Sequence, residues 1–111
     1  MKDATSNPLQ RREKVMKRDE ILKILEGARK GARQKYKAEI KGIFGSYARG
    51  EESAGSDLDV LVEFLEGADL FDFVGVGIFL EEMLGLSVDI VPLRSIREEI
   101  KPYISKEAVY L

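Results

Sequence analysis

The chain has 111 residues, with 18 Lys and Arg, 20 Asp and Glu, and neither Cys nor His. That length accommodates one domain, and the missing Cys and His exclude disulfides, zinc–thiolate sites, thiol nucleophiles and imidazole bases. Acid–base or metal chemistry would therefore rest on carboxylates, Lys, Tyr, hydroxyl groups and backbone, which favours hard cations such as Mg²⁺.

The chain shows no sign of a membrane segment or an export signal. Its longest uncharged apolar run, residues 73–80, is too short to span a bilayer, and residues 1–12 contain no apolar signal core. We therefore expect no membrane association and a cytoplasmic location.

The net charge of −2 hides an uneven distribution. Residues 1–41 carry 13 basic and 6 acidic side chains, whereas residues 42–111 carry 5 and 14. A basic front could meet nucleic acid, nucleotide phosphates or an acidic partner, and the alternative is an ordinary solvated helix face.

The predicted elements begin after a polar lead-in. Residues 1–12 contain Asn7-Pro8 and are predicted to be flexible, so residues 13–111 would form the domain. Apolar residues spaced by three, four and seven predict a helix from Glu13 to Tyr36. A short strand over 40–45 follows, and then one helical turn over 46–49 that Ser46 would cap.

The second half of the chain alternates strands and helices. Its predicted elements are a strand over 57–64, a helix from Leu70 to Leu84 closed by Gly85, a strand over 87–91 stopped by Pro92, a helix over 95–101 before Pro102, and a final turn over 105–111. This order predicts a single α+β domain, an α/β sandwich.

Two carboxylates begin the strand over 57–64. Asp57 and Asp59 are two residues apart, so they share one face of that strand and would repel each other without a cation. Asp89 lies in the apolar strand over 87–91, where a charge in a central strand is costly unless it is paired or metal-bound. The alternatives are a cap or loop for the first two and a water-facing edge strand for Asp89.

A possible phosphate-binding turn precedes these carboxylates. Gly45 follows a strand and would let a phosphate approach the backbone, and Ser46 would offer a hydroxyl and an N–H at a helix start. Taken alone, this pair would more often be an ordinary turn and cap. Beside three carboxylates it indicates phosphoryl transfer from a nucleotide.

The ordered motifs Gly45-Ser46, Ala48-Arg49-Gly50, Ser56-Asp57-Leu58-Asp59 and the later Asp89 resemble a known signature. They are similar to those of the DNA polymerase β-like nucleotidyltransferase superfamily, in its minimal nucleotidyltransferase (MNT) branch. Members of this branch are often the antitoxin of HEPN–MNT toxin–antitoxin modules. The resemblance covers about residues 39–91 and implies a mixed sheet of three or four strands packed with helices.

The resemblance also implies roles. Asp57, Asp59 and Asp89 would be catalytic and would bind two Mg²⁺ ions, with Asp89 able to take the acceptor's proton. The implied substrate is a nucleoside triphosphate, ATP in the first instance, whose NMP passes to a hydroxyl, here a tyrosine of a HEPN toxin. The nucleotide and phosphate site would comprise Gly45, Ser46, Arg49 and Ser56. The alternative for Arg49 is a structural ion pair that braces the turn.

Other functions remain open on the sequence. The chain could be a non-catalytic antitoxin that neutralises its partner by binding, or a nucleotidyltransferase for small molecules such as antibiotics. The absence of a second domain after Leu111 makes a polymerase or direct nucleic-acid binding unexpected.

The helix over Leu70–Leu84 has apolar residues nearly all round. A second apolar stripe, Phe71, Val74 and Ile78, has little of so small a chain to cover it. We therefore expect a partner or homodimer interface there, unless the first helix or the chain end covers the stripe.

Overall fold

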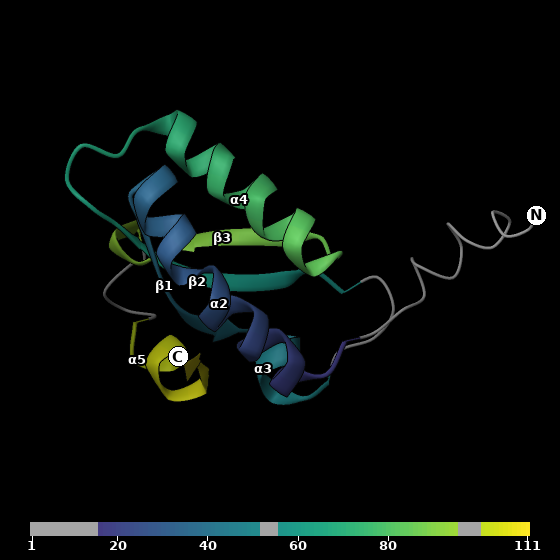
Figure 1. Cartoon of the computed structure of the whole chain (residues 1–111). Helices are drawn as coiled ribbons and strands as arrows, with labels where there is room; N and C mark the ends of the chain where they lie inside the picture. The colour runs from purple at the N-terminus through teal and green to yellow at the C-terminus, as the bar shows by residue number, and fades with distance from the viewer. Residues whose placement is uncertain (1–15, 52–55, 96–100) are drawn as a thin grey trace, which may run out of the picture.

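The structure, a computed structural model, describes residues 16–51, 56–95 and 101–111 (Figure 1). The predicted lead-in, the first residues of the first predicted helix and residues 96–100 lie outside these ranges. In chain order the elements are α2 (Arg18–Tyr36), β1 (Ala38–Phe44), α3 (Ser46–Arg49), β2 (Leu58–Phe64), α4 (Leu70–Leu84), β3 (Val88–Pro92), the 3-10 helix η1 (Leu93–Ser95), α5 (Lys101–Glu107) and β4 (Val109–Tyr110).

The four strands form one mixed sheet in the order β3-β2-β1-β4. Strand β1 pairs antiparallel with both β2 and β4, and β2 pairs parallel with β3. The predicted α+β fold with a mixed sheet is confirmed. Because β2 runs antiparallel to β1 and parallel to β3, its first residues lie beside the end of β1 and the start of β3.

Helices α2 and α4 pack against each other and against the sheet, as Figure 1 shows. The 3.6-residue period of α2 buries Ile21, Leu25, Ala28 and Ala32. Alternate residues of β2 point toward these helices and are buried: Leu58, Val60 and Val62. The core therefore lies between one face of the sheet and this helix pair.

Helix α4 has the bounds predicted for it, because both ends carry caps. The Asp69 carboxylate accepts a hydrogen bond from the Asp72 N–H at 3.1 Å, and the Asp72 carboxylate accepts one from the Asp69 N–H at 3.0 Å. Gly85 ends the helix in the left-handed conformation, as expected. Within the described ranges, no helix is long and apolar enough to cross a membrane.

Strand β3 ends at Pro92, one residue later than predicted, and it can include this proline because β3 is an edge of the sheet. The Ser87 carbonyl accepts a hydrogen bond from the Leu58 N–H of β2 at 2.9 Å. Alternate residues face opposite ways along a strand, so the backbone of Val88, Ile90 and Pro92 points away from β2. Proline has no N–H to donate, and at this outer position the ladder loses no hydrogen bond.

The C-terminal part of the chain also differs from the prediction. Of the helix predicted over 95–101, residues 96–100 lie outside the described residues, and the described helix α5, Lys101 to Glu107, includes Pro102. The expected final turn is instead strand β4, which pairs Val109 with Ile43 of β1. A two-residue strand is too short to show alternation in the sequence.

Candidate functional site

Asp59 and Asp89 are register partners on the parallel strands β2 and β3. Neighbouring strands lie about 5 Å apart, and residues in register point to the same face, so the two carboxylates share one face of the sheet. The expectation that Asp89 belongs to a central strand is wrong. Strand β3 is the sheet edge and Asp89 is exposed, so its charge stays in contact with water.

Asp57 lies on the same side of the sheet, just before β2. It is exposed and stands two residues before Asp59, about 7 Å along the strand. Burial raises the pKa of the half-buried Asp59 carboxyl above its ordinary value, and the negative charges of Asp89 and Asp57 raise this pKa further. Arg49 lowers it in part. The negative charges of Asp57 and Asp89 therefore both act on the carboxyl of Asp59.

The Gly45 turn packs directly against Asp59. Gly45 follows the end of β1, where Phe44 pairs with Asp59. Its φ of 85° and ψ of −153° lie in a region that only glycine adopts readily. A Cβ at Gly45 would lie 2.5 Å from Oδ2 of Asp59, so the Asp59 carboxylate would have to move to make room for it. Glycine is thus required here both by conformation and by the closeness of the carboxylate.

The prediction that Ser46 caps the short helix is wrong, because Gly45 is the N-cap residue of α3 and Ser46 is the first helical residue. The Gly45 carbonyl accepts a hydrogen bond from the Arg49 N–H at 3.1 Å. Tyr47 is buried in the core and fixes α3 on the sheet. Ser56 is half-buried immediately before Asp57.

Arg49 pairs with two carboxylates. Its Nε donates to Oε1 of Glu51 at 2.9 Å, and its Nη1 donates to Oε1 of Glu107 at 3.5 Å. These pairs connect α3 to α5 and raise the pKa of the Arg49 guanidinium. The structural ion pair that we considered for Arg49 is therefore present. The same side chain is close enough to Asp59 to lower the pKa of its carboxyl.

The carboxylate oxygens of Asp57, Asp59 and Asp89 are ligands that suit a hard divalent cation, but their positions do not form a ligand set. In the parts of the chain that the structure describes, no group of three or more carboxylates is close enough to hold a metal ion as it stands. Burial and the neighbouring charges of Asp89 and Asp57 raise the pKa of Asp59, and a cation bound here would oppose both effects.

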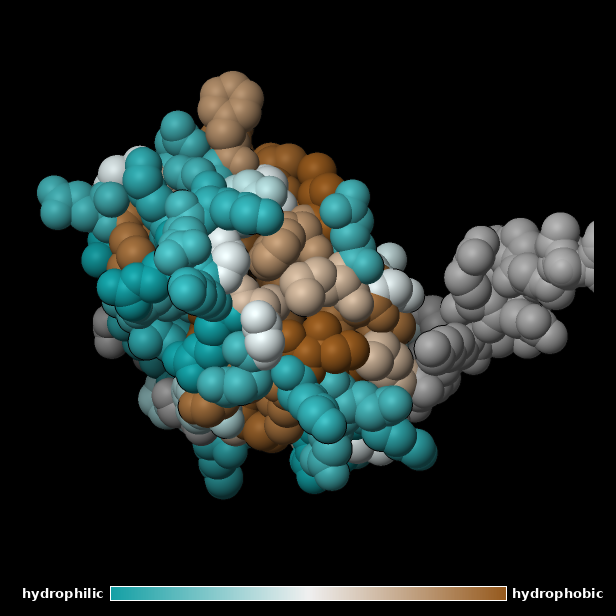
Figure 2. All heavy atoms as spheres, viewed as in Figure 1, coloured by the Kyte–Doolittle hydropathy of each residue, from teal (hydrophilic) through white to brown (hydrophobic). Residues whose placement is uncertain are grey.

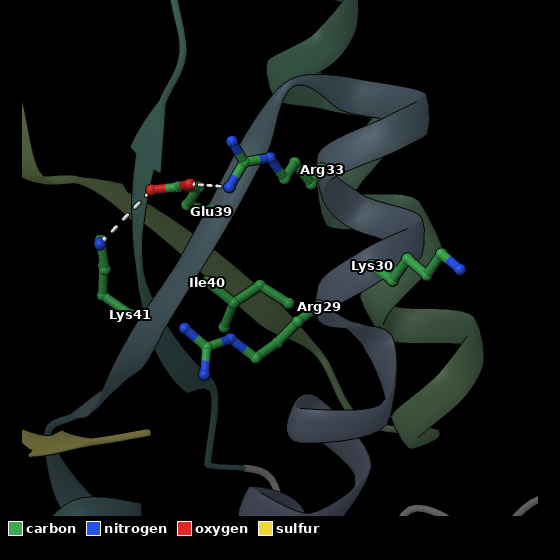
Figure 3. Close-up of a pocket in the computed structure, with 6 residues that line it drawn as sticks. All are labelled: Arg29, Lys30, Arg33, Glu39, Ile40 and Lys41. Carbon is green, nitrogen blue, oxygen red and sulfur yellow. Dashed lines mark hydrogen bonds and ion pairs between the residues drawn. The ribbon is translucent and has the colours of Figure 1, made fainter.

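Two pockets lie between a helix and a strand of the sheet. One of about 330 Å³ lies between α2 and the start of β1, where Arg33 pairs with Glu39, which also pairs with Lys41 at 3.4 Å (Figure 3). Lys30 points away from it into solvent in that view. Glu39 stands five residues before Phe44, about 17 Å along the strand. This pocket is therefore separate from the Gly45 turn.

The second pocket, of about 280 Å³, lies between α4 and the edge strand β3 and includes Asp89 in its lining. Sequence reasoning missed Glu81, which lies in this lining. The Glu81 carboxylate accepts a hydrogen bond from the outward N–H of Val88 at 2.9 Å and so ties the edge strand to α4. Sequence reasoning also missed Glu107, which pairs with Arg49 although the two are 58 residues apart. Neither pairing leaves a local pattern in the sequence.

Comparisons with known proteins agree with this geometry. The family model described as nucleotidyltransferase domain matches residues 25–111, which include every predicted site residue. Protein adenylyltransferase MntA of Thermococcus cleftensis is 39% identical over 93 residues, which cover 84% of this chain and 94% of that protein.

Solved structures share the fold. One described as a minimal nucleotidyltransferase superposes with a TM-score of 0.72 at 36% identity and covers 86% of this chain and 97% of that one. A toxin–antitoxin complex with AMP-PNP contains a chain with a TM-score of 0.61 at 23% identity, over 86% of this chain and 72% of that one, a likeness of fold alone. The family match, the relatives and the register of Asp59 with Asp89 lead to one conclusion: the chain belongs to the nucleotidyltransferase domain family and is an enzyme of its minimal type.

Proposed function

We propose that this nucleotidyltransferase is the antitoxin of a toxin–antitoxin pair in the cytoplasm, and that it transfers AMP from ATP to a hydroxyl of a HEPN toxin in a Mg²⁺-dependent reaction. The observation that carries the proposal is the register pairing of Asp59 with Asp89, beside Asp57 and the Gly45 turn. A relative is named a protein adenylyltransferase, and structures with this fold include an AMPylated HEPN toxin bound to an MNT antitoxin.

Asp57, Asp59 and Asp89 would hold two Mg²⁺ ions. Bound Mg²⁺ supplies charge neutralisation and polarisation of the phosphate oxygens. Burial and repulsion from Asp89 and Asp57 raise the pKa of Asp59, and a bound cation would replace that repulsion by attraction. Gly45 and Ser46 would hold the β- and γ-phosphates, because a turn without a Cβ lets phosphate oxygens approach the backbone.

The chain's own groups define the chemical step. The acceptor hydroxyl oxygen forms a bond to the α-phosphorus of ATP, and the bond from that phosphorus to the bridging oxygen of pyrophosphate breaks. The hydroxyl proton passes to the carboxylate of Asp89, whose exposed position on the edge strand lets an acceptor approach. Pyrophosphate leaves, and AMP stays on the acceptor.

The test uses ATP labelled at the α-phosphate and, as acceptor, a purified HEPN protein from the same organism. We expect label on the HEPN protein with wild type, none with Asp57→Asn/Asp59→Asn, and none when the label is on the γ-phosphate. Equal labelling by wild type and the double variant would refute the proposal. Chelation of divalent cations should abolish labelling if Mg²⁺ is required.

A second candidate is neutralisation by binding alone, which the exposed apolar residues of α4 favour. It makes a different prediction for cells that express the toxin. If binding suffices, Asp57→Asn/Asp59→Asn still protects them, whereas an AMP-transferring antitoxin loses protection with the same variant.

A further inference from the structure

One long segment of the sequence has acidic but no basic side chains. From Gly50 to Leu93 the sequence contains eleven Asp and Glu and no Lys or Arg. This segment includes β2, α4 and β3. Unbalanced charge of one sign produces a field that attracts oppositely charged partners over about a Debye length, roughly 8–10 Å.

An apolar stripe lies inside this acidic segment. Phe71, Val74 and Ile78 of α4 are 85%, 50% and 52% exposed, and their spacing of three and four residues places them on one helix face. Figure 2 shows apolar side chains in a band that follows α4 from the top to the right of the view. Helix α2 packs on another side of α4, so it does not cover this stripe.

The stripe continues into the groove between α4 and β3. Val74 and Ile78 form part of the groove wall, and Asp89 lines the same groove from the edge strand. The edge itself offers little to a pairing strand, because the outward N–H of Val88 is bound by Glu81 and Pro92 has none. The groove therefore suits side-chain packing, and it opens beside the edge strand whose other face carries the Asp89 carboxylate.

We propose that the α4 stripe and the α4–β3 groove are the docking surface for the acceptor protein, and that the docked segment is apolar on one side and basic at its flanks. This rests on the proposed function. Carboxylates border the stripe at both ends, Asp69 and Asp72 before it and Glu81 and Glu82 after it. An apolar segment flanked by Lys or Arg would bury the stripe and pair with this rim, and it would bring its hydroxyl to the edge strand that carries Asp89.

The experiment measures the affinity of the full chain for the HEPN protein and AMP transfer to it. We expect Val74→Asp/Ile78→Asp to raise the Kd at least about tenfold, since central apolar contacts carry most binding energy. Glu82→Lys should weaken binding less, and only at low salt. The KM for the HEPN protein should rise, while kcat at saturation and affinity for ATP stay unchanged.

The control is Tyr103→Asp, which places the same charge on an apolar side chain that is 67% exposed on α5. It should change none of these values. Circular dichroism and thermal unfolding verify that each variant is folded. Gly77→Ala is a second test of the groove in the same binding measurement, because its Cβ would fill part of the groove at an ordinary 3.5 Å from Ile90 without strain. Its control is Gly27→Ala on α2, where nothing lies within 4 Å.

The outcomes separate this proposal from the proposed function. If wild type binds the HEPN protein through α4 but transfers no AMP, the docking surface stands and the adenylylation proposal fails. If wild type transfers AMP and the α4 variants do so with unchanged KM, the docking proposal is overturned. It is also overturned if light scattering shows a wild-type dimer that the α4 variants dissociate while HEPN binding is unchanged, since the stripe would then be covered by a second copy.

Discussion

Asp59 and Asp89 lie side by side on two parallel strands and share one face of the sheet. Oδ2 of Asp59 fills the space that a side chain at Gly45 would need. One carboxylate thus connects the end of β1, the first half of β2 and the edge strand. The predictions below follow from contacts around it.

Gly45→Ala should destabilise the protein by about 1–3 kcal/mol and abolish AMP transfer, because its Cβ would displace the Asp59 carboxylate and the backbone would be strained. Urea unfolding and labelling from α-labelled ATP measure the two effects. Gly50→Ala is the matched control, since Gly50 also has a positive φ but nothing lies within 4 Å of its Cβ position. It should cost about 1–2 kcal/mol and retain transfer. Activity in Gly45→Ala would contradict the assigned role of this turn.

Asp59→Asn should stabilise the metal-free protein, because the wild-type carboxyl has a raised pKa in the folded state. A carboxyl that binds its proton more tightly when folded costs stability above that pKa, and the cost disappears as the pH falls through it. The stability difference between the variant and wild type should therefore shrink on acidification from pH 7. Calorimetry across pH measures this, and a difference independent of pH would refute it.

In the presence of Mg²⁺, wild type should instead be more stable than Asp59→Asn. Ion binding to the folded state raises the free energy of unfolding, by about 2.7 kcal/mol at a hundred times the Kd. We expect Mg²⁺ to raise the melting temperature of wild type and to have little effect on Asp57→Asn/Asp59→Asn. Equal shifts in both proteins would show that the cation binds elsewhere.

Arg49→Ala tests the two roles considered for this residue. Its ion pairs with Glu51 and Glu107 are exposed, so their loss should change the free energy of unfolding by less than about 1 kcal/mol. If Arg49 also contacts the nucleotide, the KM for ATP should rise several-fold. Glu107→Gln removes one partner and keeps the arginine, so it should leave the KM near wild type. Equal KM values in all three proteins would leave Arg49 with a structural role only.

Glu81→Ala should lower AMP transfer without a large loss of stability, because it frees the Val88 N–H and loosens the strand that carries Asp89. An exposed hydrogen bond to a charged group contributes about 1.5 kcal/mol or somewhat more. Glu81→Gln keeps a carbonyl acceptor and should recover most activity. Hydrogen exchange at Val88 provides the direct measurement, and unchanged exchange in Glu81→Ala would contradict the proposed brace.

The main elements were predictable because their signals are local. The spacing of Leu25, Ala28 and Ala32 predicts the buried face of α2, and the caps of α4 at Asp69 and Gly85 are short-range hydrogen bonds. The candidate site was predictable for a similar reason, since Gly45, Asp57 and Asp59 stand within fifteen residues of one another. The edge position of Asp89 was not, because strand order depends on pairing between segments far apart in the chain.

By itself, the sequence determined which chemistry this protein can use. A chain without Cys or His is left with carboxylates, Lys, Tyr, hydroxyl groups and backbone, and Gly45-Ser46 with Asp57 and Asp59 indicates the use of carboxylates on a nucleotide. Only the tertiary structure decided where that chemistry is exposed. Parallel pairing of β2 with β3 brings Asp89 beside Asp59, edge placement lets Pro92 remain in a strand, and packing of α2 on one side of α4 leaves Phe71, Val74 and Ile78 uncovered. Each of these results depends on contacts between distant segments, which the identity of neighbouring residues does not specify.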